Sequence, residues 1–552
     1  MKQEQYDYII VGAGSAGCVL ANRLTEDEGA RVLVLEAGPA DRSIFIHMPS
    51  AFAYPLANDK YNWFYDTEPE PFMNSRKMHC PRGRVLGGSS SINGMVYIRG
   101  HAFDYDAWAD MSGLEQWSYA HCLPYFKKAE TRLKGGDTYR GDQGPLYVTT
   151  AACKNPLYRA FIEAGQQAGY PYTDDMNGYQ QEGLGPMDMT VYQGRRWSAA
   201  QAHLRPAAKR SNLRVVTRAQ VTQVLFKGTR AIGVEYAHGS HLHQVYATRE
   251  VILSGGAINS PQLLMLSGIG NADELRAFGI QPRVNLPGVG QNLQDHIEVY
   301  VQYASKQPIT LYSAMNPLAK LKIGMQWLFA GKGLGATNHF ESGGFIRSAA
   351  GVVRPDLQYH FLPMAVSYDG SAPATQHGFQ AHVGPMRATS RGHVKLRSAD
   401  PKAHPRILFN YMQTEQDRKE MRAGVRLTRE IFAQAAFEPF RNGEISPGAK
   451  VQSDAEIDAF IRDKAESAFH PSCSCRMGTD PMAVVDGAGR VHGIQNLRVV
   501  DASIMPNVVS GNLNAPTIMI AEKMADLIRG RSPLPAQKAP VYVAPNHATR
   551  QR

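Results

Sequence analysis

The first thirty-six residues of this chain carry the feature that most limits how it can fold. Two apolar runs flank Gly12, Gly14 and Gly17, which are spaced as Gly-x-Gly-x-x-Gly. Gly12 permits a sharp turn, Gly14 lets the backbone approach a pyrophosphate, and Gly17 lets a helix pack against the strand. The N–H groups at the start of that helix favour phosphate. Glu36 ends the second run, where a carboxylate can accept hydrogen bonds from ribose. The stretch predicts a dinucleotide-binding unit, without separating FAD from NAD.

The length and the two ends of the chain limit its organisation. At 552 residues the chain is too long for a single core, so we expect two or three packed domains. No run of about 18 apolar residues is present, which argues against a transmembrane helix. The N-terminus enters the first predicted strand directly, leaving no room for a signal peptide. We therefore expect a cytoplasmic protein.

The charge of the chain is basic, with a net charge of +10 and a pI of about 9.1. An ordinary basic surface explains this balance, and attraction to an anionic membrane face is the alternative. No basic-aromatic stripe or known nucleic-acid-binding motif is present, so no nucleic-acid partner is expected.

The cysteines do not form the pattern of a disulfide framework or a metal site. Cys473 and Cys475 are close together, but no second Cys/His pair with zinc-like spacing accompanies them. The six cysteines are too few and too scattered for a set of disulfides in a cytosolic chain. We expect free thiols and no metal.

Two further stretches have the composition of a cofactor site. The segment 83–95 holds several glycines, three consecutive serines and Asn93, which suits a backbone pressed against a ligand. The segment 250–270 is an apolar strand that ends in small residues and continues into a helix, a second strand-to-helix connection suited to the same parallel sheet.

From about residue 297 the pattern changes to alternating strands and amphipathic helices. The sequence therefore predicts an α/β protein, with a Rossmann-like, discontinuous dinucleotide-binding domain and an α+β substrate domain. We place the first domain at 1–155, 190–296 and 467–533 and the second at 297–466. Residues 156–189 are expected to connect them, and 534–552 to form a loosely held C-terminal tail.

Three motifs together resemble those of the glucose–methanol–choline (GMC) flavoprotein oxidoreductases, over residues 5–530. The first is the unit of Gly12, Gly14 and Gly17. The second is Gly83-Arg84-x-Leu86-Gly87-Gly88-Ser89-Ser90-x-Ile92-Asn93. The third is Gly256-Ala257-x-x-Ser260-Pro261-x-Leu263-Leu264-x-x-Ser267-Gly268-Ile269-Gly270. The latter two are long and specific. The resemblance implies FAD rather than NAD as the cofactor.

Three other segments are similar to the choline-oxidising members of that family. They are Tyr61-Asn62-Trp63 with Glu68–Met73, the segment 338–348, and Gln358-Tyr359-His360-Phe361-Leu362-Pro363. Some relatives attach FAD covalently through a His just before the Asn of the Gly-Gly-Ser-Ser loop. That position is Ile92 here, so we expect a dissociable, non-covalent FAD.

The resemblance also assigns catalytic residues. His470, followed by Pro471, matches the family's histidine beside flavin N5, a role that needs a base near neutrality. On sequence alone a histidine that caps a turn would be the commoner explanation. Asn514 matches the second catalytic position, and we expect its side chain to hold the substrate oxygen beside His470.

A quaternary ammonium substrate cannot donate a hydrogen bond, so its site needs a carboxylate and aromatic faces. By resemblance Glu298 supplies the carboxylate and Trp63 an aromatic face. Periodicity alone would make Glu298 a solvated strand residue. His360 is the third expected substrate contact, although a buried core histidine is an equal alternative.

The resemblance gives a set of expected FAD contacts, in which Val221 is judged only from its position in the family. The set comprises Gly12, Gly14, Ser15, Ala16, Gly17, Glu36, Ala37, Arg84, Gly87, Gly88, Asn93, Gly94, Met95, Val96, Val221, Asp501, Ala502, Pro516 and Thr517.

The expected activity is FAD-dependent oxidation of choline to betaine aldehyde, with onward oxidation to glycine betaine left open, and with electrons passed to a respiratory acceptor at the membrane. Three alternatives remain. They are a GMC enzyme acting on another primary alcohol, an oxidase that uses oxygen directly, and a lyase or binding protein with structural FAD.

Overall fold

The computed structural model describes residues 4–366 and 375–552 and places the N-terminal strand inside a seven-stranded sheet. Strand β1 (Gln5–Val11) pairs in parallel with β2 (Val32–Glu36) on one side and with β14 (His241–Leu253) on the other. Parallel strands are covered on both faces, which explains why the buried parts of β1 and β2, residues 8–11 and 32–35, are apolar. The sheet is therefore the core of the predicted Rossmann-like domain.

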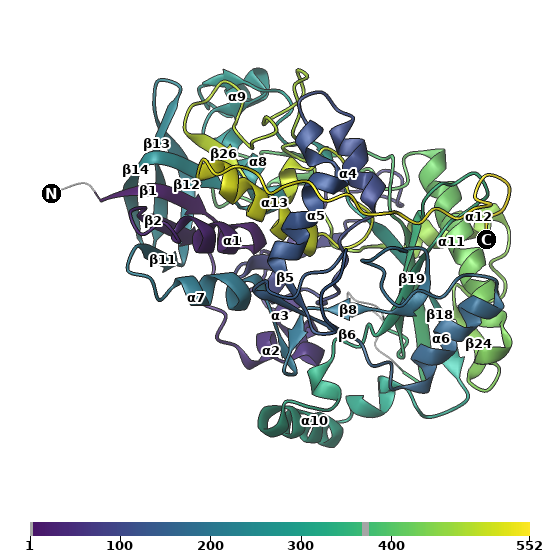
Figure 1. Ribbon diagram of the computed structural model, residues 1–552. Coiled ribbons are helices and arrows are strands. Elements are labelled where there is room, and N and C mark those ends of the chain that lie inside the picture. The colour runs from purple at the N-terminus through teal and green to yellow at the C-terminus, as the bar shows by residue number, and fades with distance from the viewer. Residues whose placement is uncertain (1–3, 367–374) are drawn as a thin grey trace.

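The strands of this first sheet come from three separated parts of the chain. Its order is β11 (Leu213–Thr217), β2, β1, β14, β13 (Arg230–His238) and β12 (Ala219–Lys227), with β26 (Leu497–Val499) paired to β14. Figure 1 shows purple, teal and yellow strands side by side at this place. A discontinuous domain is thus required by the strand order, and the predicted fold class is confirmed.

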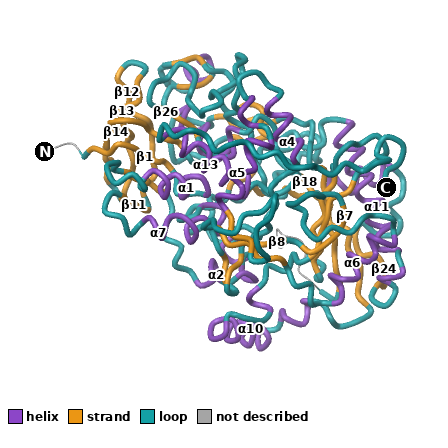
Figure 2. Tube along the Cα trace, in the orientation of Figure 1, coloured by secondary structure: helices purple, strands orange, loops and turns teal. Residues whose placement is uncertain are grey.

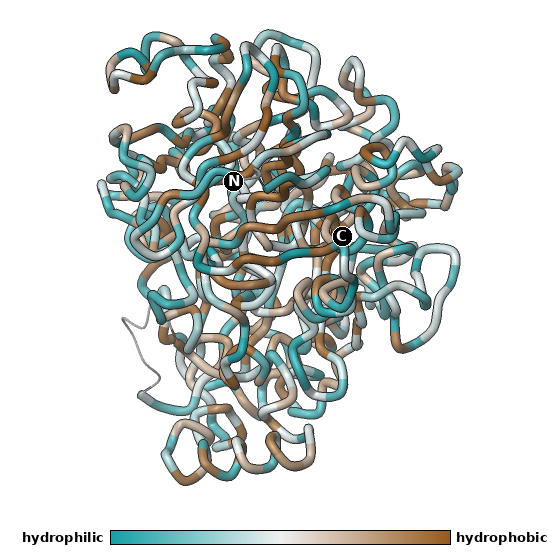
Figure 3. The backbone as a smooth tube through the Cα atoms, turned by 90° about the vertical axis from the view of Figure 1, so that its left-hand side faces the viewer, coloured by the Kyte–Doolittle hydropathy of each residue, from teal (hydrophilic) through white to brown (hydrophobic). Residues whose placement is uncertain are grey.

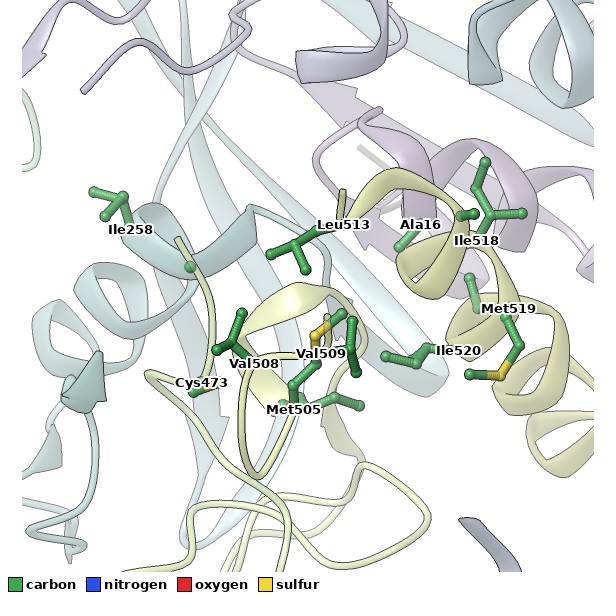
Figure 4. Packing of buried hydrophobic residues seen from close by; sticks show 14 of the residues in the cluster. Ala16, Ile258, Cys473, Met505, Val508, Val509, Leu513, Ile518, Met519 and Ile520 are labelled. Atoms are coloured by element: carbon green, nitrogen blue, oxygen red, sulfur yellow. The ribbon is translucent and has the colours of Figure 1, made fainter. Parts of the chain in front are cut away.

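The two ends of the chain also meet in the helical layer beside this sheet. Helix α1 (Ser15–Leu24) packs against α13 (Asn514–Ile528), and α13 packs in turn against α5 (Tyr119–Ala129). Figure 4 shows Ala16 of α1 next to Ile518 of α13. Helix α13 is buried over most of its length, so residues 467–533, which we call the C-terminal return, are an integral part of the first domain.

A second, largely antiparallel sheet forms the core of the other domain. Its order is β24 (Arg441–Ser446), β18 (Ile297–Ser305), β21 (Gly378–Pro385), β20 (Leu357–Leu362), β19 (Ser342–Ile346) and β7 (Gly183–Pro186), with β25 (Glu466–Ser467) paired to β18. Helix α11 (Glu415–Ala433) turns a buried apolar stripe toward this sheet, and charged residues cover its other face. Figure 2 shows this second set of strands on the opposite side of the molecule from β1.

Two boundaries differ from the sequence-based expectation. Residues 156–189 do more than connect the domains, because they supply helix α6 (Pro156–Gln167) and the edge strand β7 to the second sheet. The C-terminal tail is held along the surface rather than loosely attached. The backbone N–H groups of Gln537 and Tyr542 donate to carbonyls of Ala120 and Tyr179.

The remaining larger elements lie around these two sheets. They are α2 (Ile44–His47), α3 (Ala53–Leu56), α4 (Ala102–Ala109), β5 (Glu130–Arg132), β6 (Leu146–Thr150), α8 (Gly256–Leu266), α9 (Ala272–Ala277), α10 (Pro317–Ala330), β22 (Gly392–Lys395), β23 (Arg406–Leu408) and α12 (Asp454–Lys464). All six cysteines are buried free thiols. Within the two described ranges, no helix has the length and apolarity that crossing a bilayer requires.

A substitution at Gly17 can test the close contact between α1 and β1. A Cβ at this position would lie 1.9 Å from the carbonyl oxygen of Gly12. Gly17→Ala should therefore force the helix away from the strand and lower the free energy of unfolding by about 3 kcal/mol or more. The measurement is the thermal unfolding midpoint together with flavin retention. Gly29→Ala is the matched control, because its Cβ would meet nothing closer than 3.5 Å; equal midpoints for the two variants would contradict this account.

Candidate active site

A large cavity lies where the two sheets meet, and both domains line it. The first domain contributes the turn between β1 and α1, the loop 83–96 and the start of α8. The second contributes Glu298, Phe340 and His360, and the C-terminal return contributes His470 and the segment 512–517. Residues that are far apart in the sequence are therefore brought to one site.

Glycines allow three backbone segments to meet at one end of this cavity. Gly12 has a φ of +100°, and a Cβ there would lie 2.6 Å from the carbonyl oxygen of Ser254. A Cβ on Gly88 would lie 2.6 Å from the Cα of Gly14. Side chains at these positions would fill the space beside the N-terminus of α1, where backbone N–H groups favour phosphate. This end of the cavity fits the pyrophosphate of a dinucleotide.

Glu36 lies in the same wall, with its orientation fixed by the backbone. One carboxylate oxygen accepts the N–H of Ala13 at 2.9 Å and the other accepts the N–H of Gly38 at 2.8 Å. Burial raises the pKa of Glu36 to about 7, although the two N–H groups oppose the shift. Each oxygen keeps a lone pair, so the residue can still accept from ribose hydroxyls. The buried hydroxyl of Ser254, which lines the cavity, has no hydrogen-bond partner within the described protein, as expected where a ligand completes the site.

Most of the predicted FAD contacts line this cavity. Those that do so are Gly12, Gly14, Ser15, Ala16, Glu36, Ala37, Gly88, Asn93, Gly94, Met95, Val96, Val221, Asp501, Ala502 and Thr517. Gly17, Arg84, Gly87 and Pro516 are not in the wall. Gly17 and Gly87 are needed for backbone packing, because a Cβ at either position would collide with a neighbour. The guanidinium of Arg84 lies over the ring of Trp63, 4.9 Å from its centroid.

The N-terminus of α13 opens on the cavity. The sequence predicts Asn514 beside His470, but the structure places Asn512 there. The side-chain oxygen of Asn514 accepts a hydrogen bond from the hydroxyl of Ser15 at 2.8 Å. Asn512 instead places its Nδ2 3.1 Å from Nε2 of His470. A separation of two residues at the start of a helix turns the two side chains in different directions. The residue beside His470 is thus Asn512, and Asn514 belongs to the wall of the dinucleotide site.

His470 lies in a chain of hydrogen bonds that determines which ring nitrogen carries the proton. Its Nδ1 is 3.0 Å from Nδ1 of His296, whose Nε2 is 3.0 Å from the carbonyl oxygen of Met386. A carbonyl only accepts, so His296 carries its proton on Nε2, and its Nδ1 accepts from Nδ1–H of His470. The Nε2 lone pair of neutral His470 then faces Asn512, toward the cavity.

The two histidines are held together by one buried carboxylate, that of Asp295. Its Oδ1 accepts the backbone N–H of His296 at 2.9 Å and that of His470 at 2.7 Å. Its Oδ2 accepts the hydroxyls of Tyr411 and Ser467, each at 2.5 Å. Burial raises the pKa of Asp295, and the hydroxyls of Ser467 and Tyr411, followed by the charge of Arg82 and the N–H of His470, oppose that shift. Three segments of the chain are fixed at this point.

Burial also controls the protonation of the histidines. Burial, and then the neighbouring His296, hold the pKa of His470 well below its usual value. Burial lowers the pKa of His296 and of His360 to about 4. All three rings are therefore neutral near pH 7, and His470 is in the form that can accept a proton.

Glu298 stands in the cavity wall with one of its oxygens bound. Its Oε1 accepts from Nδ1 of His382 at 2.9 Å, and its Oε2 lies 3.9 Å from Nδ1 of His360. The amide of Gln380 donates to Nε2 of His382 at 2.7 Å, because the oxygen of Gln380 already accepts from Gln302. His382 is thereby required to donate to Glu298 through Nδ1. The carboxylate is buried and oriented, so it is not a solvated strand residue.

The aromatic groups near Glu298 differ from the expectation. Trp63 lines the cavity, but its ring stacks on Tyr65 at 5.8 Å and lies against the guanidinium of Arg84. Phe340 also lines the cavity, with its ring centroid 5.9 Å from that of His360. Phe340 is therefore an aromatic side chain beside His360, which itself lies next to Glu298. A substrate contact of Trp63 remains a prediction.

Sequence reasoning missed Asn512, His296 and His382. Asn512 lies two residues from Asn514, and either asparagine fits the start of an apolar helical stripe. His296 directly precedes the strand that carries Glu298, a position that gave a weak signal. His382 is on β21, and only the antiparallel pairing of β21 with β18 brings it to Glu298. That pairing cannot be read from local sequence.

Comparison with known proteins shows strong similarity over almost the whole chain. The family model described as GMC oxidoreductase matches residues 6–298 with its N-terminal part and 388–521 with its C-terminal part. The mitochondrial choline dehydrogenase of Mus musculus is 60% identical over 549 residues, covering 98% of this chain and 92% of the relative. An oxygen-dependent choline dehydrogenase of Pseudomonas fluorescens is 59% identical over 547 residues, covering 98% and 96%. The structure of a formate oxidase from Aspergillus oryzae, from a study of FAD modification, matches with a TM-score of 0.90 and 27% identity, covering 96% of this chain and 99% of that one.

The buried neutral histidines predict how stability depends on pH. In the unfolded chain a histidine titrates near pH 6.5, whereas His360 folded does so at about 4. Below about pH 6.5 the unfolded state binds the extra proton, so stability should fall as the pH falls toward 4, by about 1.4 kcal/mol per pH unit for each such residue. Urea unfolding at a series of pH values measures the slope. His360→Gln should reduce it by about one proton; an unchanged slope would contradict the assigned neutral state.

Proposed function

Because the chain belongs to the GMC oxidoreductase family, we propose that it is an FAD-dependent choline dehydrogenase that oxidises choline to betaine aldehyde. The predicted family and the FAD cofactor are confirmed by the matches over nearly the full chain. The observation that carries the choline assignment is this similarity together with a buried, oriented carboxylate, Glu298, in the same cavity as His470.

The proposed chemistry begins with the substrate hydroxyl. FAD, when bound, supplies the acceptor for the hydride that leaves the alcohol carbon. We propose that Nε2 of His470 accepts the proton of the substrate hydroxyl, because the ring is neutral and this nitrogen faces the cavity. The amide of Asn512 lies next to that nitrogen and can donate to the substrate oxygen as negative charge develops on it. The proton that His470 accepts makes an imidazolium, whose Nδ1–H still donates to His296.

The substrate cation is assigned to the other part of the cavity. Glu298 offers its less constrained oxygen, Oε2, and Phe340 an aromatic face, the two features that favour a quaternary ammonium. The N-terminus of α13 also opens on the cavity, and its positive dipole end favours negative charge on a bound cofactor in its reduced state.

The electron acceptor is a finer proposal. An electron acceptor is required to complete the cycle, and we propose one from the respiratory chain, with peripheral contact of the protein at a membrane. Some of the most similar relatives are named oxygen-dependent choline dehydrogenases, so direct use of oxygen is the alternative. Anaerobic and aerobic reoxidation rates of the reduced flavin separate the two.

The experiment that tests the proposed reaction is anaerobic mixing of the yellow holoprotein with choline, followed at the flavin absorbance band. We expect rapid bleaching. Bleaching by a neutral primary alcohol but not by choline would retain the family and contradict the substrate. A flavin that no alcohol reduces would favour a lyase or a binding protein with structural FAD.

His470 and Asn512 should be needed for flavin reduction, and Asn514 should not act with them. We expect His470→Ala and Asn512→Ala each to lower the anaerobic rate of flavin reduction by about 10²-fold, the scale of a lost acid–base group or oxyanion donor. FAD content should be retained in both variants. Asn514→Ala is the matched control and should change the rate by less than about tenfold, because no reacting atom loses a partner. The reverse order of the two asparagine variants would refute the assignment to Asn512.

Glu298 should distinguish a charged substrate from a neutral one of the same shape. Glu298→Gln should lower kcat/KM for choline by about 10²-fold or more, because the ammonium loses a close opposite charge in a buried site. For 3,3-dimethylbutan-1-ol, in which carbon replaces the nitrogen, the same change should have a small effect. Stopped-flow reduction with both alcohols provides the comparison. Equal losses for both would contradict a charge-binding role.

A further inference from the structure

Helix α10 (Pro317–Ala330) is attached to the body of the protein by one buried side chain. Among its residues only Trp327 is buried. The indole N–H of Trp327 donates to the carbonyl of Gly194 at 2.6 Å, and the guanidinium of Arg195 lies over its ring at 5.0 Å. Figure 1 shows α10 projecting from the lower edge of the molecule, and Figure 3 shows a coil with brown, hydrophobic segments at the same edge. The helix is anchored but not enclosed.

The outward face of α10 is apolar. At 100° per residue, Leu318, Leu321, Met325 and Phe329 fall on the side opposite Trp327. Their exposed fractions are 80% for Leu318, 63% for Leu321 and 78% for Phe329, and Met325 is also exposed. A continuous apolar face of this kind on a surface helix marks an interaction site, whereas single exposed apolar residues scattered over a surface are ordinary. We refer to these four residues as the α10 face.

The α10 face continues toward a second exposed apolar group. Phe45 of α2 and Tyr54 of α3 stack with ring centroids 4.9 Å apart, and both are about half exposed. The segment between them contacts the turn that follows α10, where the methyl end of Met48 would meet a Cβ on Gly335. Exposed apolar side chains therefore lie on adjoining segments along this edge.

The charged residues of α10 and of the turn that follows it have one sign. Residues 317–332 hold no Asp, Glu or Arg, and their charged residues are Lys320, Lys322 and Lys332. Lysines beside an apolar face favour a surface that is both apolar and anionic, since the long side chains reach headgroups while the apolar residues enter the acyl boundary. A second copy of the chain fits less well, because a two-fold contact through α10 would place lysines against lysines.

We infer that α10 docks this protein on an anionic lipid bilayer, with the α10 face inserted at the headgroup boundary and the neighbouring lysines on acidic headgroups. The α10 face would be the surface that makes the peripheral membrane contact proposed above together with the respiratory acceptor. The inference therefore depends on that proposed contact, and it does not depend on choline being the substrate. The chain that follows α10 reaches the cavity wall. Asn338, eight residues after Ala330, donates to the carbonyl of Gly94 at 2.7 Å, and Gly94 lines the cavity.

The test is co-sedimentation of the holoprotein with vesicles. Phosphatidylcholine vesicles are compared with vesicles of phosphatidylcholine and phosphatidylglycerol in a two-to-one ratio. We expect binding to the mixed vesicles that weakens with added salt. The triple variant Leu321→Gln, Met325→Gln, Phe329→Gln should reduce the bound fraction by more than about tenfold. Leu242→Gln, at a residue 64% exposed on β14, is the matched control and should bind as the wild type does.

Flavin content and the rate of reduction by choline, measured in solution, should be unchanged in both variants, which separates a docking defect from misfolding and from failure of the proposed reaction. As a second measurement, Phe329→Trp should be quenched by brominated phosphatidylcholine in mixed vesicles. The inference is overturned if the wild type fails to bind mixed vesicles, or if the triple variant binds equally well. It is also overturned if sedimentation velocity shows a lipid-free wild-type dimer that the triple variant dissociates.

Discussion

The active site depends on the buried carboxylate of Asp295, which holds together segments that the two domains contribute. Its oxygens accept the backbone N–H groups of His296 and His470 and the hydroxyls of Tyr411 and Ser467. A buried carboxylate without such donors would be costly, and four of them offset much of that cost. Because both histidine backbones are fixed at one point, their rings meet in a defined geometry. The position of the base is thus set by a group that does not face the substrate.

The same principle orients the other polar groups of the cavity. A carbonyl at Met386 determines the tautomer of His296 and through it that of His470. The amide of Gln380 determines the tautomer of His382 and thereby the orientation of Glu298. In each case a group of fixed hydrogen-bonding character, outside the reacting centre, settles which nitrogen of a buried histidine carries a proton.

The fold and the dinucleotide site could be predicted from sequence because their signals are local. The glycine spacing and Glu36 mark positions where the backbone approaches a ligand or another segment closely, and few residue types fit at such positions. Residues 156–189 were assigned too small a role, because the pairing of edge strand β7 depends on a partner about 160 residues away. Asn514 was predicted beside His470 in place of Asn512 for a similar reason. The orientation of a side chain at the start of a helix depends on the residue at which the helix begins. The histidine contacts depend on strand pairing and on the C-terminal return.

The most direct test of this account is the tautomer of His470 in the holoprotein at neutral pH. A multiple-bond ¹H–¹⁵N spectrum of histidine-labelled protein distinguishes a protonated ring nitrogen from one with a free lone pair, and His470→Ala identifies the signal. We expect a neutral ring with the proton on Nδ1 and the lone pair on Nε2, where it can accept the substrate proton. A proton on Nε2 of the neutral ring, or an imidazolium, would contradict this account.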